Sequence, residues 1–506
     1  MGLFRMVSSF GSTFHAFSNI SRAGTDPAVL TGKPMTLSQI KSDPSVIQQK
    51  RLKVLKRINA ELNNLEALAG VAKLQSIPTH LEIDFSSKCN LRCTMCHQSK
   101  LKMGSFQLQH ADIDALINAL PYVETVMIAG LGEPLLYRGL ETFLPFLSRY
   151  GCHAHLFTNG QLIDKRLDAL VHVQRISVSI DGASKAVFEE LRRGASFERV
   201  INNVRLLRAR AVKSTIVTST VISNRNLHEI ADIVALAVEL GLNEVHLSPV
   251  DHTPALMLTP ELYPAFEAQL VKARALASRA KLELHNNITA AHFRHNRNAT
   301  IASSDLAKAA TLNELPVLFP GAQVEGQYSE LLDSTDLEAQ TEGSMDISSQ
   351  FIHGLDAQAE VAEIEQRISQ QSAHLNALRK RIKQERQKLQ TPYCSAPWKY
   401  GFARSNGHAR LCPYADINVG AVRDKLSGNY NSVLLEQVRG SLAQGQPVLF
   451  VCQNCSDDHR QFRAVSLEHA RRAFARSSLT NQLILWLRQA KQWASGDKAA
   501  KPPWPT

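Results

Sequence analysis

Cysteine is scarce in this chain, with eight residues in 506, and no window approaches the ~18 uninterrupted apolar residues of a transmembrane helix. So low a cysteine density excludes the disulfide framework of a small secreted domain. The length suggests two or three domains. Apolar residues make up 44% and charged residues 20%, which is typical of a globular protein. The net charge of +11 comes with no recognisable nucleic-acid module, so we expect no nucleic-acid partner.

Residues 1–25 lack acidic side chains and contain Arg5 and Arg22 with several serines and phenylalanines. Transit peptides share this composition, although an ordinary mobile amino terminus is the simpler interpretation. The segment has no apolar h-region and no small-residue cleavage pattern, which argues against secretion. Tightly clustered cysteines in a chain without a signal favour metal ligation in a reducing compartment. We therefore expect a cytoplasmic protein with no membrane contact.

Strand-like and helical segments alternate over residues 78–290, which we expect to form the main domain. An extension, residues 1–77, precedes it and becomes helical at 46–75. Parallel strands joined by crossover helices follow from such alternation, and six repeats fit a partial (βα)6 barrel of the α/β class. The expected strands are Leu81–Phe85, Thr125–Ala129, His155–Thr158, Ile176–Ile180, Thr215–Ile222 and Glu244–Ser248.

The alternation stops near residue 290, and residues 291–390 read as an insertion of two halves. Ala309–Gln366 contains no Lys or Arg, and the composition of 300–350 predicts a flexible acidic linker. A long amphipathic, coiled-coil-like helix follows, with Gln371 and Glu385 as polar breaks in its heptad seam. The apolar seam consists of Val361, Ile364, Ile368, Leu375, Leu378, Ile382 and Leu389.

That helix needs a partner for its apolar seam. Packing within the chain against the helix around Leu55–Leu65 is the favoured interpretation. A helical partner or self-association through 357–390 is the alternative. A small cysteine-bearing domain is expected at 391–460, and a basic helical tail at 461–506.

The first constellation of chemical interest is the segment Lys88–Cys96, which contains Cys89, Cys93 and Cys96. Three thiolates at these spacings can wrap one cubane-sized cluster from a single loop. Iron–sulfur clusters normally take four cysteine ligands, so three leave one iron open to a small molecule. The loop follows the strand ending at Phe85, at the end of the sheet where βα folds place their active sites. A zinc site is the alternative, although it usually shows paired Cys-x-x-Cys elements.

Cys-x-x-x-Cys-x-x-Cys after the first strand of a βα barrel resembles the radical S-adenosylmethionine (SAM) superfamily. Three further motifs, Gly130–Pro134, Thr158–Gly160 and Ser177–Gly182, match in order at successive strand ends, and Arg192–Gly194 follows. The resemblance spans roughly residues 78–250. It implies a [4Fe–4S] cluster on Cys89, Cys93 and Cys96, and bound SAM. The residues that it implies for cofactor binding are Gly130, Gly132, Glu133, Pro134, Asn159, Ser179, Asp181 and Arg192.

Each implied role has a physical basis. Glu133 would accept a hydrogen bond from the amino group of the methionine moiety. Ser179 would offer its hydroxyl to the carboxylate or the ribose. Arg192 or Arg193 would pair with that carboxylate, unless it forms a surface salt bridge. Asp181 would either touch the ligand or cap the next helix.

Other residues of the motifs have simpler readings. Thr158 and Asn159 would shape the floor of the site as turn residues. Two positions depart from the family pattern. Leu131 stands where many members have glycine, and Met95 stands where an aromatic ring often lies near the adenine. Methionine can pack on a ring, so we expect the adenine contact to persist.

The second constellation combines Cys394–Trp398, Gly407–Cys412 and Cys452–Cys455. It resembles the auxiliary-cluster domains called SPASM and Twitch. The resemblance implies a second [4Fe–4S] cluster with four ligands, Cys394, Cys412, Cys452 and Cys455, and a zinc knuckle is the alternative. The remaining cysteine, Cys152, reads as a small buried hydrophobe.

The resemblance implies an oxidoreductase or modifying enzyme. Reductive SAM cleavage would give a 5′-deoxyadenosyl radical that abstracts hydrogen from the substrate, with flavodoxin or ferredoxin as reductant. The substrate is either a peptide or a small molecule such as a sugar alcohol, aminocyclitol or cofactor precursor. A non-catalytic iron–sulfur scaffold or redox sensor is the alternative. The sequence identifies no catalytic acid or base. His246 and Ser248 end a strand facing the expected cavity, although a core histidine is the simpler reading.

Overall fold

The structure is a computed structural model, and it describes residues 44–96, 98, 105–250, 253–293, 357–384, 394, 396–412, 415–425 and 430–444. Several predictions from the sequence lie outside these residues. They concern the amino-terminal segment up to residue 43, the acidic linker at 300–350, Glu385 and Leu389, Cys452 and Cys455, and the tail at 461–506.

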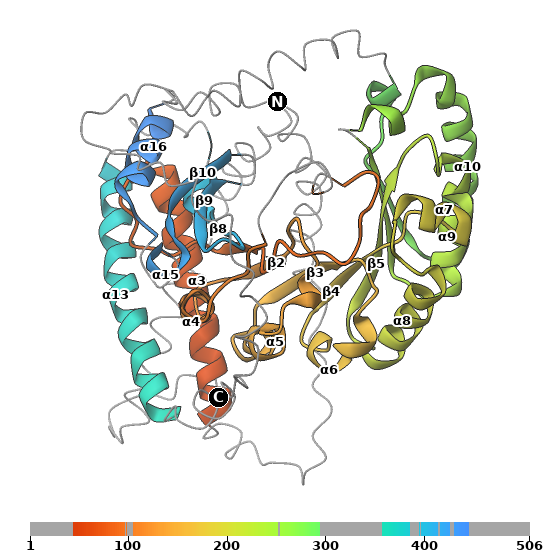
Figure 1. Cartoon of the computed structure of the whole chain (residues 1–506). Helices are drawn as coiled ribbons and strands as arrows, with labels where there is room; N and C mark the ends of the chain where they lie inside the picture. Colours follow the sequence, from red (N-terminus) through yellow and green to blue (C-terminus); the bar gives the residue numbers. More distant parts are fainter. Residues whose placement is uncertain are drawn as a thin grey trace, which may run out of the picture. The chain divides into compact units, whose positions relative to one another are not determined.

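Seven parallel strands, β1 to β7, form the barrel part of one ten-stranded sheet whose order is β10-β9-β8-β1-β2-β3-β4-β5-β6-β7 (Figure 1). Six of them match the expected strands within a few residues. The seventh, Glu283–Asn286, was not predicted, because its sequence Glu-Leu-His-Asn contains only one apolar residue. The bounds are β1 His80–Ile83, β2 Thr125–Ile128, β3 His153–Thr158, β4 Arg175–Ser179, β5 Thr215–Ile222, β6 Glu244–Pro249 and β7 Glu283–Asn286.

Helices connect these strands and cover one face of the sheet. Strand β4 shows the resulting pattern, since Ile176 and Val178 belong to the main apolar core while Ser177 and Ser179 alternate with them. Because side chains alternate across a strand, these serines point to the opposite, inner face of the barrel. The helices are α4 His110–Ala119, α5 Leu140–Arg149, α6 Leu167–Leu170, α7 Lys185–Leu191, α8 Phe197–Arg210, α9 Ile230–Glu239 and α10 Tyr263–Ala280.

The helix α3 (Pro44–Leu68) lies beside α13 (Ala357–Gln384), as Figure 1 shows. Leu375 is fully buried in an apolar cluster that includes Ile58 and Leu62 of α3. Gln371, a polar break in the seam, is also buried and donates a hydrogen bond to Asn59 Oδ1 at 3.0 Å. The seam of α13 is therefore covered within the chain, by the helix that the sequence favoured as its partner.

The carboxyl-terminal segment continues the barrel's sheet instead of forming a sheet of its own. Strand β8 pairs with β1 in parallel, with Phe402 opposite Glu82, and β9 and β10 follow antiparallel. Arg439 is fully buried and donates to the backbone oxygens of Pro397 and Tyr430 at 2.9 and 2.8 Å. The elements are α14 Ala396–Lys399, β8 Tyr400–Ala403, β9 His408–Cys412, β10 Ala415–Ala421, α15 Val422–Lys425 and α16 Val433–Ala443.

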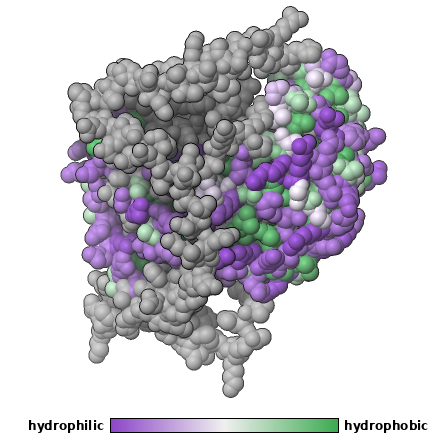
Figure 2. All heavy atoms as spheres, in the orientation of Figure 1, coloured by the Kyte–Doolittle hydropathy of each residue, from purple (hydrophilic) through white to green (hydrophobic). Residues whose placement is uncertain are grey.

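Hydrophilic residues cover much of the described surface that Figure 2 shows, with apolar residues interspersed. Large exposed apolar side chains are scattered, for example Val212, Val271 and Val433. Among the described helices, none combines the length and the hydropathy that a membrane span requires.

Candidate functional site

The loop that contains the three cysteines follows β1 and is fixed by the end of α7 and the residues after it. The Arg92 backbone N–H donates to Arg193 O at 2.9 Å, and the Thr94 N–H donates to Leu191 O at 2.8 Å. These bonds join two segments about 100 positions apart in the sequence. The cysteine loop therefore lies against the segment that contains Arg192.

The three thiols of this loop, Cys89, Cys93 and Cys96, are half-buried and lie within electrostatic reach of one another. Burial raises the pKa of the Cys93 thiol to about 11. Arg192 opposes this rise, whereas Asp181 and the other two thiols add to it. Burial also raises the pKa of Cys89. Three convergent thiols from one loop, with an arginine beside them, suit a cluster whose irons replace the thiol protons.

Two glycines allow the loop after β2 to approach the cysteine loop closely. A Cβ atom at Gly132 would lie 1.9 Å from Ser86 O, and one at Gly130 would lie 2.1 Å from Asp84 Oδ1. Neither position can hold a side chain without moving its neighbour. The backbone N–H of Glu133 then donates to Lys88 O at 2.8 Å, which joins the two loops.

The carboxylate of Glu133 is buried and held by three hydrogen bonds. Thr158 Oγ1 and the Asn159 N–H donate to it at 2.7 Å each, and the Leu135 N–H donates at 3.1 Å. Asn159 Nδ2 also donates to Asn90 Oδ1 at 2.9 Å. Burial raises the pKa of Glu133, and these bonds oppose the rise. Thr158 and Asn159 therefore orient the glutamate in addition to shaping a turn.

Asp181 is fully buried and forms an ion pair with Arg192, whose Nε lies 2.7 Å from Asp181 Oδ2. The other carboxylate oxygen accepts from the Val221 N–H at 2.7 Å. Arg192 Nη1 lies 4.0 Å from Cys93 Sγ. The capping alternative for Asp181 is wrong, because Ser184 is the N-cap of α7. A buried carboxylate beside the arginine serves to hold the guanidinium at the cysteine loop.

The other predicted residues lie around this centre. Ser179 is the last residue of β4 and is half-buried on the inner face. Pro134 opens a short 3-10 helix after Glu133. Met95 is buried in an apolar cluster with Leu191, against which Cys93 packs. The predicted contacts of these residues with SAM stay predictions.

The structure also places polar residues on the inner face that the sequence did not single out. Burial raises the pKa of Asp84 to about 6, with Arg404 opposing the rise, and Ser405 Oγ donates to its Oδ2 at 3.1 Å. Arg175 is bidentate on Glu244 across β4 and β6. The available signal was the alternation of polar with apolar residues in strands that should be buried.

The carboxyl-terminal cysteines are described only in part. Cys394 and Cys412 are both half-buried and pack against one small apolar cluster that contains Tyr400 and Phe402. Because both cysteines pack against the same apolar residues, they are close enough in the fold to be considered as ligands of one metal centre. Cys152 is buried as predicted, and Lys56 Nζ lies 3.2 Å from its Sγ.

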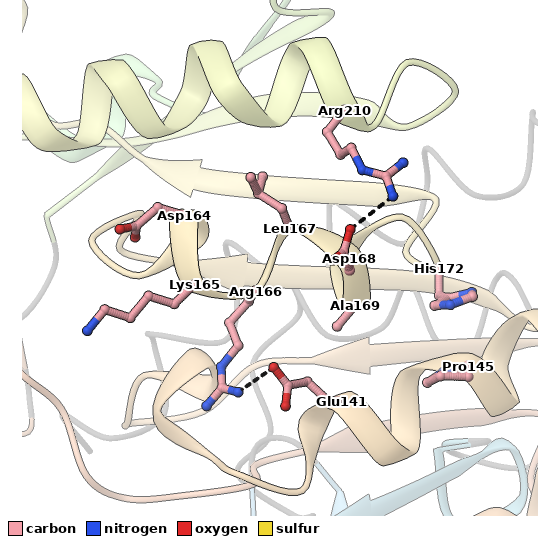
Figure 3. A pocket seen from close by; sticks show the side chains of 10 residues that line it. All are labelled: Glu141, Pro145, Asp164, Lys165, Arg166, Leu167, Asp168, Ala169, His172 and Arg210. Atoms are coloured by element: carbon pink, nitrogen blue, oxygen red, sulfur yellow. Dashed lines mark hydrogen bonds and ion pairs between the residues drawn. The ribbon is translucent and has the colours of Figure 1, made fainter. Parts of the chain in front are cut away.

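A surface pocket of about 470 Å³ lies elsewhere, among α5, α6 and α8 (Figure 3). Both of its arginines are paired, Arg166 with Glu141 at 2.7 Å and Arg210 with Asp168 at 2.9 Å. It contains none of the residues predicted for the cofactors. We therefore place the candidate site at the cysteine loop.

The fold and the loop together define an α/β protein of parallel strands with a three-cysteine centre at the carboxyl end of β1. Residues 83–237 match the family model described as the Radical SAM superfamily. Over this segment, the chain is therefore similar to the radical SAM superfamily.

Curated relatives carry related names. A probable GTP 3′,8-cyclase of Saccharolobus islandicus is 27% identical over 175 residues, 33% of this chain and 55% of the relative. An AdoMet-dependent heme synthase of Methanosarcina barkeri is 28% identical over 180 residues, 34% and 51% of the two chains. The chain thus spans about half the length of the curated relatives that it matches.

Two solved structures show more distant similarity. Streptococcus suis SuiB bound to S-adenosylmethionine has a TM-score of 0.43 and 15% identity, with 76% of each chain covered. Native anSMEcpe with bound AdoMet also has a TM-score of 0.43, with 14% identity over 80% of this chain and all of that one.

Proposed function

We propose that this enzyme cleaves SAM reductively at a [4Fe–4S] cluster held by Cys89, Cys93 and Cys96, in the reducing cytoplasm. The cluster would supply one electron and an open iron, so that breakage of the SAM carbon–sulfur bond yields methionine and a 5′-deoxyadenosyl radical that abstracts hydrogen from the substrate. The observation that carries this proposal is the convergence of three thiols in one loop of a segment that is similar to the radical SAM superfamily.

The surrounding residues have defined tasks in this proposal. Glu133, already fixed by Thr158 and Asn159, presents its carboxylate where the ammonium group of SAM needs an acceptor. Arg192, fixed by Asp181, places a positive charge beside the thiolates and the SAM carboxylate. Gly130 and Gly132 let the loop after β2 pack closely on Asp84 and on the backbone at Ser86, so that Glu133 would lie beside the same ligand.

The second part of the proposal is an auxiliary [4Fe–4S] cluster on Cys394, Cys412, Cys452 and Cys455. Its SPASM- or Twitch-like role would be electron transfer during an oxidation of a small molecule or a peptide. The clustering of Cys394 and Cys412 around one apolar patch supports it. A flavodoxin or ferredoxin would deliver the electron for SAM cleavage.

The test of the first part compares two cysteine variants of the anaerobically reconstituted chain. With dithionite and SAM, the wild type should release 5′-deoxyadenosine, and Cys93→Ala should release none. The matched control is Cys152→Ala, because Cys152 is buried away from the loop and should affect neither iron content nor product. Equal release by Cys93→Ala and the wild type would refute the assignment.

Iron analysis tests the second part. The wild type should hold about eight irons, and the Cys394→Ala, Cys412→Ala double variant about four. SAM cleavage should persist in that variant, because the first cluster is intact. Zinc bound to these cysteines in place of iron would refute the auxiliary cluster and leave the radical SAM assignment unaffected.

A further inference from the structure

Three metal-ligating side chains converge on the barrel strands, outside the cysteine loop. Glu244 is the first residue of β6, His246 is the third, and His285 lies on β7. His246 and His285 are register partners on these adjacent strands. One ligand atom from each residue lies within 4.8 Å of the others. Two histidines and one carboxylate are a frequent ligand set for zinc and for ferrous iron.

These side chains face the inside of the barrel. Val245 and Leu247 alternate with them along β6, and both are fully buried in the core that packs against the helices. Because neighbouring side chains on a strand point to opposite faces, Glu244 and His246 point inward. His285, the register partner of His246 in a parallel pair, points to the same side.

The distances suit ligation. Nε2 of His246 lies 2.9 Å from Glu244 Oε2, and Nε2 of His285 lies 3.4 Å from the same oxygen. Donors bound about 2.0–2.2 Å from one ion are separated by such distances. The His285 Nε2 atom is buried and lies 3.4 Å from Oε2 of both Glu244 and Glu283, without a hydrogen bond of good geometry to either. The neutral tautomer that is unprotonated at Nε2 offers a lone pair to a cation there.

Arg175 adds a second observation. Its Nη2 lies 3.2 Å from His246 Nε2, which is also 2.9 Å from a carboxylate oxygen. A ring nitrogen carries either a proton or a lone pair, so neither neutral tautomer satisfies both contacts. Ligation of an ion by His246 and Glu244 accounts for their closeness, because ligands that share an ion approach one another. Arg175, bidentate on Glu244, then fixes the carboxylate, and its charge weakens metal binding.

The register places this cluster near the radical SAM centre. Ser179, Ser219 and His246 are successive partners across β4, β5 and β6, so Ser179 and His246 are about 10 Å apart at ~4.8 Å per strand. Val221, two residues beyond Ser219, packs against the same apolar cluster as Cys93. Two residues of strand correspond to about 7 Å. A ligand bound at the cluster therefore lies within the reach of a substrate that also meets the SAM site.

We propose that Glu244, His246 and His285 bind a divalent transition-metal ion, zinc or ferrous iron, on the inner face of the barrel. Three protein ligands leave coordination positions open, and these hold an oxygen-donor group of the substrate. Metal binding stands independently of the radical chemistry, whereas the role in holding substrate rests on the proposed function.

The test measures Zn²⁺ binding by the iron–sulfur-loaded full chain, after removal of loosely bound metal and without SAM. The wild type should bind about one equivalent of zinc, and His246→Ala and His285→Ala should each lose at least tenfold in affinity. The matched control is His172→Ala, because the His172 ring lies away from this cluster, beside Ser148 Oγ at 3.1 Å, and this variant should bind zinc as the wild type does. Unchanged iron content and melting temperature verify folding of each variant.

Zinc K-edge X-ray absorption separates this site from the cysteines, because it detects the zinc ligands without interference from iron. The wild type should show nitrogen and oxygen neighbours at about 2.0–2.1 Å and no sulfur. In His285→Cys, one sulfur neighbour should appear about 2.3 Å from the zinc. Such a sulfur is seen only if residue 285 binds the zinc directly. No zinc beyond the clusters, sulfur ligands in the wild type, or equal affinity of the alanine variants would each overturn the proposal. Zinc binding as expected without 5′-deoxyadenosine release would uphold this site and refute the proposed function instead.

Discussion

Replacing Asp84 with Asn should stabilise the protein at neutral pH and leave it unchanged in acid. Asp84 is 6% exposed, at the end of β1, and burial raises its pKa from an ordinary 3.8 to about 6. Because folding raises this pKa, the fold favours the protonated carboxyl. The stabilisation that this preference provides is fully present below about pH 4, and it is lost as the pH rises through about 6.

The magnitude follows from the two pKa values. The difference between about 6 and 3.8 corresponds to about 3 kcal/mol, at ~1.4 kcal/mol per pKa unit. Asparagine resembles the neutral carboxyl and keeps an oxygen that can accept from Ser405 Oγ. The gain in the free energy of unfolding for Asp84→Asn should therefore be near zero at pH 4 and approach about 3 kcal/mol above pH 7.

Urea unfolding from pH 4 to pH 8 under anaerobic conditions measures this difference. The control is Asp168→Asn, since the Asp168 side chain is 90% exposed and its replacement should change stability by less than about 0.5 kcal/mol throughout. A difference between Asp84→Asn and the wild type that stays constant with pH would refute the reasoning. It would mean that the Asp84 carboxyl titrates alike in the folded and unfolded chain.

Gly132→Ala should prevent cluster assembly, because its Cβ would lie 1.9 Å from Ser86 O. Gly440→Ala is the control, since no atom lies near its Cβ, and iron analysis of both variants checks the difference. Arg192→Met should lower the free energy of unfolding by about 3–5 kcal/mol, because it leaves the Asp181 carboxylate buried without its cation. Adding Asp181→Asn should restore part of that free energy, as measured by denaturant unfolding. Leu375→Ala should cost about 2–5 kcal/mol in the same assay, since the side chain is fully buried between α3 and α13.

The barrel could be predicted from sequence where its strands are rich in apolar or β-branched residues. Strand β5, Thr215–Ile222, consists of β-branched residues apart from Ser219, and its predicted bounds match the structure. Strand β7 has only Leu284 as an apolar residue, so it is specified by its pairing with β6 and not by its own pattern. The parallel pairing of β8 with β1 was also beyond prediction, because it joins residues more than 300 positions apart.

The candidate site likewise combines residues that a local motif identifies with residues that only the fold brings together. Cys89, Cys93 and Cys96 could be identified from sequence because their spacing is local, and in the structure their thiols lie within electrostatic reach of one another. The support for the site is not local. Asp84 receives its hydrogen bond from Ser405, 321 positions away, and no periodicity in either segment indicates that contact.

The polar inner face of the barrel is the feature whose meaning emerges only when the strands are combined. From sequence alone, His246 in a buried strand is interpreted as a core histidine. In the structure, His155 Nε2 lies 2.8 Å from Ser177 Oγ on the next strand, and His246 contacts Glu244 and Arg175. Burying polar groups costs free energy unless each has a partner, and these histidines find their partners in residues that only the pairing of strands brings together. Because the opposite face of the same strands is apolar and packs on helices, polar side chains in these strands can gather only on the inner face.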